Sequence, residues 1–172
     1  SLAYLERLAT SYQRVSPPLD RRECDVNALI TDVIRAQGHE QIEITTDLSE
    51  VPHILGDPIA LRPILENLTA NAVDSLPSRR GQITVSTRVV EQARDAMIVR
   101  VTVADSGRGM SADESKRIFD DFYTTKEGGT GLGLSIVRRL VMDLGGTIAV
   151  ESEAGQGTRM IVDIPAGDQT RR

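Results

Sequence analysis

The stretch "DFYTTKEGGTGLGLSIV", residues 121–137, places four glycines within six positions, directly before an apolar run that is typical of a helix. Glycines at the start of a helix expose backbone N–H groups that have no partner inside the helix, and these groups together with the helix dipole favour anions. A phosphate tail could therefore rest near residues 131–134. A single lysine, Lys126, precedes the four glycines Gly128, Gly129, Gly131 and Gly133.

The familiar phosphate-binding loops do not match this stretch. A Walker loop needs a lysine after its last glycine, and a dinucleotide fingerprint needs a strand directly before G-x-G-x-x-G. A protein-kinase glycine loop needs H-R-D and D-F-G partners, which the sequence lacks. Taken alone, the stretch is equally compatible with a flexible surface loop that caps a helix.

The composition favours one domain with a short appendage. The chain has 172 residues, of which 40% are hydrophobic and 26% charged, and its formal net charge is −5. That charge argues against a general affinity for nucleic acid, so phosphate binding should be local. The single cysteine, Cys24, cannot form an internal disulfide. No run is long and apolar enough to predict a membrane segment.

The hydrophobic spacing predicts an α+β fold. Residues 1–15 carry the apolar seam of a short coiled coil, which ends at Ser16-Pro17-Pro18. We then expect a two-layer sandwich in which a mixed, mostly antiparallel sheet of about five strands carries helices on one face. The expected helices span about 25–37, 58–76, 112–119 and 132–144, and the expected strands span about 41–48, 82–90, 97–104, 147–152 and 158–164.

The helix at 58–76 carries polar side chains on one face. Asn67 and Asn71 are four residues apart, and Asp74 lies three residues further on. Asparagine is unfavourable inside a helix, so two on one face need a reason. A solvated face is one reason, and a site for Mg²⁺, which binds amide oxygens and phosphates, is another.

The segment "VADSGRGM", residues 103–110, places Asp105 where an apolar strand ends. A carboxylate accepts hydrogen bonds only, so it favours the exocyclic amine of adenine over the carbonyl oxygen of guanine. The glycines at 107 and 109 would let the backbone approach a flat ligand closely. The alternative is an ordinary Asp-Ser-Gly turn.

Five short motifs occur in one order along the chain. They are Asn67-x-x-x-Asn71, Asp105-x-Gly107-x-Gly109, Phe119-x-x-Phe122, Gly129-x-Gly131-x-Gly133 and Gly155-x-Gly157-Thr158. The set resembles the N, G1, F, G2 and G3 boxes of the catalytic and ATP-binding domain of sensor histidine kinases, a Bergerat fold of the GHKL superfamily. The resemblance covers about residues 20–165 and looks nearest to the nitrogen- and dicarboxylate-sensing subgroup.

The resemblance implies a role for each matching position. Asn71 would ligate Mg²⁺ and Asn67 would lie beside the phosphates of ATP. Asp105 would hold the adenine amine, with Gly109 and Met110 against the ring and Thr158 on the Asp105 side. The complete set implied to bind the nucleotide is Asn67, Asn71, Asp74, Asp105, Gly107, Gly109, Met110, Lys126, Gly129, Thr130, Gly131, Leu132, Gly133 and Thr158.

The resemblance also implies a mobile ATP lid. Residues from about 107 to 131 would form it, with the Phe119 and Phe122 rings as anchors on the core. Many family members carry a basic residue three places after the metal asparagine, where this chain has Asp74. Lys126 is therefore our candidate for neutralising the phosphates, and together with Asn67 it forms the expected catalytic pair.

Asn67 also indicates the type of reaction. Hydrolytic members of the superfamily carry a glutamate four residues before the metal asparagine, and this glutamate activates water. Asparagine is a poor base, so the resemblance implies transfer of the γ-phosphate to a histidine of a partner domain. A hydrolytic or regulatory ATP-binding module and a serine kinase of the anti-sigma type are the alternatives.

The phosphoacceptor histidine is not expected within this sequence. His39 and His53 lack the context of the family's phosphoacceptor box, so both are expected to be structural or surface residues. We expect residues 1–17 to be the end of a dimerisation hairpin, 18–166 the catalytic domain and 167–172 a tail. The implied partners are the dimerisation and histidine-phosphotransfer domain of the same protein, in a homodimer, and a response-regulator receiver domain. The expected location is cytoplasmic, within a parent protein that could be membrane-anchored.

Overall fold

The computed structural model describes residues 20–38, 42–92 and 96–167. The coiled-coil seam expected at residues 1–15, His39 and part of the loop after residue 90 lie outside the described residues. Within them the elements are β1 (Arg22–Cys24), α2 (Val26–Gln37), β2 (Glu43–Leu48), β3 (Ile54–Gly56), α3 (Pro58–Ser75), the 3₁₀ turn η1 (Pro77–Arg79), β4 (Gln82–Gln92), β5 (Ala96–Asp105), α4 (Ala112–Arg117), α5 (Gly133–Asp143), β6 (Thr147–Glu153) and β7 (Gly157–Pro165).

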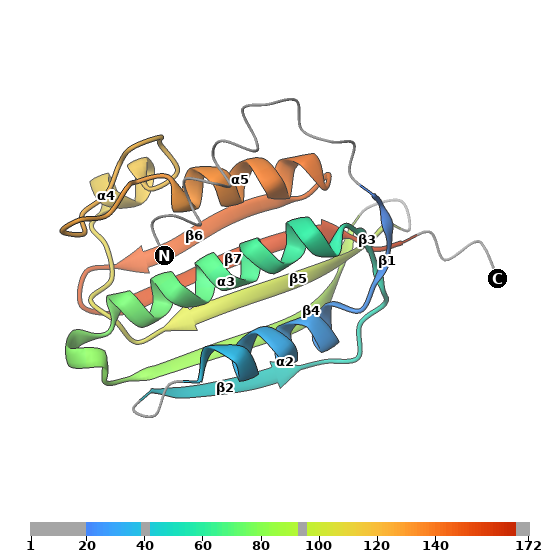
Figure 1. Cartoon of the computed structure of the whole chain (residues 1–172), viewed down its shortest axis with the longest axis horizontal. Helices are drawn as coiled ribbons and strands as arrows, with labels where there is room; N and C mark the ends of the chain where they lie inside the picture. The colour runs from blue at the N-terminus through green and yellow to red at the C-terminus, as the bar shows by residue number, and fades with distance from the viewer. Residues whose placement is uncertain (1–19, 39–41, 93–95, 168–172) are drawn as a thin grey trace.

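Five strands form the main sheet in the order β2-β4-β5-β7-β6 (Figure 1). The β2–β4 pair is parallel, and the other three pairs are antiparallel. Alternate residues of the central strands, such as Val99, Val101 and Val103, are buried in the core. The predicted mixed, mostly antiparallel sheet of five strands is confirmed.

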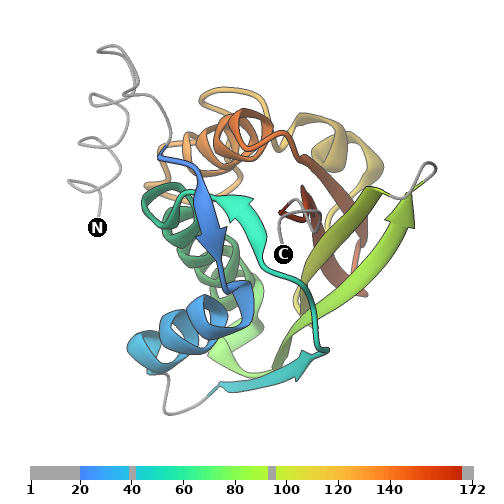
Figure 2. The ribbon, with the colours of Figure 1, turned by 90° about the vertical axis from the view of Figure 1, so that its right-hand side faces the viewer.

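Helices α2, α3 and α5 cover one face of this sheet, which gives the predicted two-layer arrangement (Figure 2). The apolar stripe of α3 is fully buried between the sheet and the other helices, and its members are Leu61, Ile64, Leu65, Leu68 and Ala72. Burial of such a stripe, rather than helix propensity, is what chiefly stabilises a helix of this kind.

Capping residues and prolines set where the helices α2 and α3 begin and where α3 ends. The Asp25 side chain accepts a hydrogen bond from the Ala28 N–H at 3.0 Å, and the Asp57 side chain accepts one from Ile59 at 2.9 Å. Pro58 occupies the first turn of α3, where its missing N–H costs nothing, and the chain leaves the helix just before Pro77. Both starting points agree with the sequence-based expectation.

A small two-stranded sheet was not predicted from the sequence. Strand β1 pairs antiparallel with β3, which joins Cys24 to Ile54 and Arg22 to Gly56. Cys24 is buried there, and its thiol donates to the Gly56 carbonyl at 3.4 Å. This sheet fixes the chain just before α3 begins.

The functional loops gather at one end of the sandwich (Figure 1). Strand β5 ends at Asp105, α3 ends at Ser75, and the irregular segment 118–132 connects α4 to the start of α5. The lid predicted at about residues 107–131 contains α4, and we call the irregular residues 118–132 that follow this helix the lid segment. The fold therefore brings the separate sequence motifs to one place.

Candidate functional site

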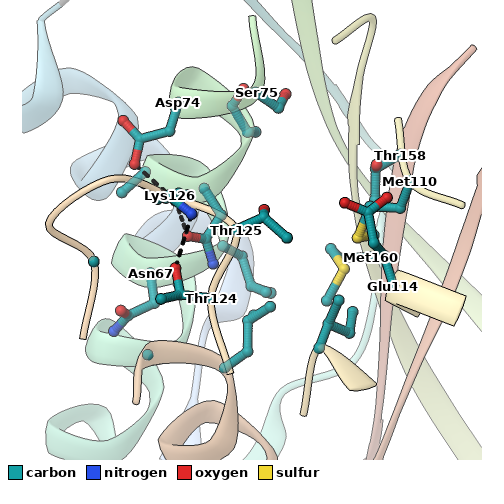
Figure 3. Close-up of a pocket in the computed structure, with 18 of the residues that line it drawn as sticks. Asn67, Asp74, Ser75, Met110, Glu114, Thr124, Thr125, Lys126, Thr158 and Met160 are labelled. Carbon is teal, nitrogen blue, oxygen red and sulfur yellow. Dashed lines mark hydrogen bonds and ion pairs between the residues drawn. The ribbon is translucent and has the colours of Figure 1, made fainter. Parts of the chain in front are cut away.

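A cavity of about 630 Å³ lies where these loops meet. One wall is α3 with the lid segment, and the opposite wall is formed by the β5–α4 loop with residues of β7 (Figure 3). Twelve of the fourteen residues predicted to bind the nucleotide line it: Asn67, Asn71, Asp74, Asp105, Gly109, Met110, Lys126, Gly129, Thr130, Gly131, Gly133 and Thr158.

Two predicted residues, Gly107 and Leu132, do not line the cavity. The Gly107 N–H donates to Asp105 Oδ1 at 2.8 Å, and a β-carbon at position 107 would lie only 2.1 Å from Ser75 Oγ. Leu132 caps α5, and its carbonyl accepts from the Ile136 N–H at 3.0 Å. Both residues shape neighbouring parts of the site instead of facing into it.

The Asn67 side chain is fixed by its own helix. Its Nδ2 donates to the Pro63 carbonyl at 2.8 Å, and because only the nitrogen can donate, the amide orientation is settled. The oxygen Oδ1 then lies 3.2 Å from where a β-carbon of Gly133 would be. Asn67 therefore presents an oxygen at the start of α5, where the sequence predicts phosphates.

Lys126 reaches from the lid segment to α3. Its Nζ donates to Asn71 Oδ1 at 2.7 Å and to Asp74 Oδ2 at 2.8 Å (Figure 3). Asn71 and Asp74 are three residues apart, so their side chains emerge on the same face of the helix. The structure thus brings together the predicted metal ligand and the predicted phosphate-neutralising lysine.

The opposite wall is built around Asp105 and the tight turns beside it. A β-carbon at position 109 would lie 1.9 Å from the Glu153 carbonyl oxygen, and a β-carbon at position 157 would lie 2.1 Å from the Asp105 carbonyl oxygen. Both glycines also have positive φ angles. The β5–α4 loop therefore packs directly against the β6–β7 hairpin.

Ser152 connects these turns, and sequence reasoning missed it. Its hydroxyl oxygen accepts from the Met110 N–H at 2.9 Å, and its single proton is donated to the Gly157 carbonyl at 2.9 Å. Thr158 Oγ1 lies 2.8 Å away and must be the donor in that pair. The lone pairs of the buried Thr158 hydroxyl are then the groups left for a ligand.

Arg108 is the second residue that sequence reasoning missed. Its backbone is fixed by hydrogen bonds to the Ser75 carbonyl at 3.1 Å and from the Gly155 N–H at 2.7 Å. Its guanidinium donates to Glu114 Oε1 at 3.4 Å and to Thr125 Oγ1 at 2.5 Å. Arg108 therefore joins the β5–α4 loop to the lid segment.

Glu114 belongs to a capping box at the start of α4. Its Oε2 accepts from the Ser111 backbone N–H at 2.8 Å, while the Ser111 hydroxyl accepts from the Glu114 N–H at 3.2 Å. The hydrogen bond from the Ser111 backbone is the main reason that the pKa of Glu114 is lowered. The carboxylate is therefore held ionised at the cavity wall.

The predicted anchoring of the lid is half correct. Phe119 packs against the core, as expected, but Phe122 is 75% exposed and adopts a φ of 63°. That backbone conformation turns the Phe122 ring outward. Tyr123 packs on the core instead, and the Arg117 guanidinium carbon lies over its ring, 4.4 Å from the ring centre. Tyr123, not Phe122, is the second anchor.

The described residues contain neither a metal cluster nor a membrane-spanning helix. No group of three or more His, Cys, Asp or Glu side chains within them could hold a metal ion. Across the same residues, every helix is too short or too polar to cross a membrane. His53, predicted to be a surface or structural residue, has a half-exposed side chain 3.9 Å from Glu23.

Residues 56–168 match the model of the histidine kinase-, DNA gyrase B- and HSP90-like ATPase family, and the chain belongs to this family. Within it, the chain has the catalytic and ATP-binding domain of sensor histidine kinases. It is 30% identical to the catalytic domain of histidine kinase ThkA, with a TM-score of 0.70, and the match covers 86% of this chain and 98% of that one. The family and the fold predicted from the five motifs are confirmed.

Two further similarities extend over most of this chain but only part of the relative. The sensor histidine kinase ZraS of Klebsiella oxytoca is 36% identical over 89% of this chain and 33% of its own length. Full-length ShkA in complex with AMPPNP has 32% identity and a TM-score of 0.79 over 97% of this chain and 35% of that one. This chain therefore spans about a third of the length of these relatives.

Proposed function

We propose that this chain binds ATP with Mg²⁺ and transfers the γ-phosphate to a histidine side chain of a dimerisation domain in the same protein. The observation that carries this proposal is the placement of Asn67. It stands beside the start of α5, at the position where hydrolytic relatives of the superfamily have a glutamate base, and its amide cannot activate water.

The cavity wall around Asp105 fits adenine. Asp105 Oδ1 already accepts from Gly107, which leaves Oδ2 for the exocyclic amine of the base. The Met110 side chain, partly buried against the core, offers an apolar surface to the ring. Thr158 adds acceptor lone pairs on the same side. A guanine would place a carbonyl oxygen against the carboxylate and should bind more weakly.

Asn71 fits a magnesium ion. Its Oδ1 already contacts a cation, because Lys126 Nζ lies 2.7 Å from it. Magnesium commonly takes one or two protein oxygens and completes its coordination with phosphates and water, which suits a site where no three His, Cys, Asp or Glu side chains of the described residues converge. When bound, the metal supplies positive charge to the phosphate oxygens.

The groups of this domain position the reactants, and the covalent step takes place at the histidine of the dimerisation domain. The bond between the γ-phosphorus and the oxygen that bridges it to the β-phosphate breaks, and a bond from the γ-phosphorus to a ring nitrogen of the partner histidine forms. The leaving ADP keeps the bridging oxygen. Lys126 and the backbone N–H groups at the N-terminus of α5 would hold the triphosphate in line for this attack, with the Asn67 amide beside the phosphates.

Our proposals for the domain boundaries, the partners and the location rest on membership of the family. We propose that residues 1–17 belong to the dimerisation hairpin, 18–166 form the catalytic domain and 167–172 form a tail. The relatives are two-component sensor kinases, so a response-regulator receiver domain is the proposed next acceptor, and a homodimer is the proposed state of the parent protein. We place the domain in the cytoplasm.

The experiment is phosphorylation of the parent protein, with its hairpin present, by γ-labelled ATP and Mg²⁺. The expected label is stable in alkali and lost in acid, as a phosphohistidine is. A parent variant in which the hairpin histidine is replaced by glutamine is the control and should take up no label. Release of free phosphate without protein labelling would reject histidine transfer in favour of hydrolysis, and an acid-stable label would indicate a serine kinase.

A further inference from the structure

Two oxygen atoms of α3 converge on one cation position in the cavity. Asn71 Oδ1 and Asp74 Oδ2 lie 2.7 and 2.8 Å from the same atom, Lys126 Nζ (Figure 3). Lys126 comes from the lid segment, so the ammonium group is not part of the helix that provides the oxygens. A different cation could therefore take the same position if the lid released the lysine.

The electrostatics of α3 favour a cation at this position. Asp74 lies in the last turn of the helix, where the helix dipole is negative, and that turn contains no basic residue. Three carboxylates, Asp74, Asp105 and Glu114, line the cavity beside two cations, Arg108 and Lys126. A triphosphate brought into this cavity adds further negative charge, so its binding requires another cation.

We propose that Asp74 belongs to the magnesium site together with Asn71, and that Lys126 fills this site only until the nucleotide brings the metal. The proposal rests on the proposed ATP-binding function. A carboxylate oxygen is a preferred ligand of Mg²⁺, either directly or through a coordinated water. Two cations on the same pair of oxygens repel each other, so the metal displaces Lys126.

The displaced lysine then has a new partner. With Asp74 and Asn71 occupied by the metal, the phosphates are the anions that the lid segment can bring to Lys126. This exchange accounts for Asp74, which stands where many family members have a basic residue. The carboxylate helps to hold the metal, and the positive charge is supplied from the lid.

The competing explanation is that Asp74 only anchors the lid through its ion pair with Lys126. The two explanations predict different effects of Asp74→Asn and Lys126→Met. If Asp74 is only an anchor, both variants remove the same ion pair and should behave alike. If Asp74 holds the metal, only Asp74→Asn should change the response to Mg²⁺.

The test is calorimetric titration of the 172-residue chain with AMPPNP, in excess Mg²⁺ and in EDTA. The Mg²⁺ enhancement, defined as the ratio of the two affinities, should fall by about tenfold or more in Asp74→Asn, as for other losses at a metal site. Lys126→Met should retain the enhancement while weakening AMPPNP binding. Asp121→Asn is the matched control, because Asp121 is an exposed carboxylate of the lid segment outside the cavity lining, and it should match the wild type.

A second readout follows the metal itself. The electron paramagnetic resonance spectrum of Mn²⁺ bound with AMPPNP should change in Asp74→Asn and stay unchanged in Lys126→Met. An enhancement and a Mn²⁺ spectrum that are unaltered in Asp74→Asn would overturn the assignment of Asp74 while leaving ATP binding intact. Failure of the wild-type chain to bind AMPPNP under either condition would overturn the proposed function and this inference together.

Discussion

The amide oxygen of Asn67 lies 3.2 Å from the point where a β-carbon of Gly133 would stand. The middle of α3 therefore approaches the first residue of α5 so closely that only glycine leaves the Asn67 side chain undisturbed. This contact gives a physical reason for the last of the four glycines, which begins α5. It also joins two motifs that lie more than sixty residues apart in the sequence.

Replacing Gly133 with alanine should lower the affinity for ATP without lowering the thermal stability of the domain. Alanine loses less backbone entropy than glycine on folding, and Gly133 does not have a positive φ, so the thermal midpoint should not fall. The added methyl group would press on Asn67 Oδ1, and we expect ATP affinity to decrease severalfold. Calorimetric titration and thermal unfolding measure the two quantities.

The matched control for Gly133→Ala is the same substitution made in an Asn67→Ala background. If the methyl group acts through the Asn67 amide, Gly133→Ala should cost no further affinity there, because contacting residues are not additive. Equal losses in both backgrounds would show that the methyl group acts elsewhere.

Asp105→Asn should weaken ATP binding by roughly tenfold to a hundredfold, which corresponds to about 1.5–3 kcal/mol for a hydrogen bond to a charged group. The reason is that asparagine has a single acceptor oxygen, which the Gly107 N–H occupies, so its NH2 donor would face the adenine amine. Titration with ATP and GTP would measure the affinity and the base preference, and the preference for ATP should shrink in the variant.

Asp163→Asn is the control for the Asp105 substitution. Asp163 pairs with Arg100 on neighbouring β7 and β5, at 2.7 and 2.8 Å, and it does not line the cavity. Its loss should lower stability and leave ATP affinity unchanged. An Asp105→Asn protein that binds ATP as tightly as the wild type would contradict the adenine assignment.

The sequence predicted the long elements of this fold because burial imposes a period on them. The stripe on α3 and the alternation in β4 and β5 are direct consequences of one buried face. The three-residue strands β1 and β3 carry no such period, and they pair across about thirty residues. Alternation likewise does not specify direction, so the parallel pairing of β2 with β4 was not predicted as such.

The site was predicted where a motif requires a particular residue type and missed where a common residue is used. Asn71 and Asp105 stand in such motifs, whereas Ser152 is an ordinary strand residue whose role comes from the turn packed against it. Arg108 lies between Gly107 and Gly109, and this location within the motif was the only signal in the sequence that could have indicated its role. Phe122 was misassigned because its backbone conformation, not its apolar side chain, decides its exposure.

The stability of this domain should depend on pH through Glu114. The pKa of Glu114 is lowered in the folded state, so between that value and the ordinary value of about 4.3 the unfolded chain binds more protons. The stabilisation is therefore fully present above about pH 4.3 and is lost as the pH falls through the folded-state pKa. Thermal midpoints measured from pH 7 to pH 3 would show this loss.

Glu114→Gln should flatten that acid dependence, because glutamine keeps the capping geometry and has no titrating group. The matched control is Glu127→Gln, which removes an exposed carboxylate of the lid segment and should keep the wild-type pH profile. If Glu114→Gln reproduces the wild-type profile, acid destabilisation originates at other carboxylates.

Arg108→Ala should loosen the lid segment with little effect on global stability. The ion pair and the Thr125 hydrogen bond of Arg108 are largely exposed, and such contacts contribute about 1 kcal/mol or less. Because Arg108 joins the β5–α4 loop to the lid segment while Lys126 joins the lid segment to α3, loss of one contact should still leave the other. Hydrogen exchange of the lid amides near Thr125 should therefore rise severalfold in Arg108→Ala and further in the double variant with Lys126→Met.

Arg159→Ala tests whether this effect is specific. Arg159 pairs with Glu151 at 3.3 Å on the main sheet, so its loss removes an exposed ion pair of the same kind away from the lid. Lid exchange should match the wild type in this control. Unchanged exchange in Arg108→Ala would mean that the Arg108 contacts do not restrain the lid segment.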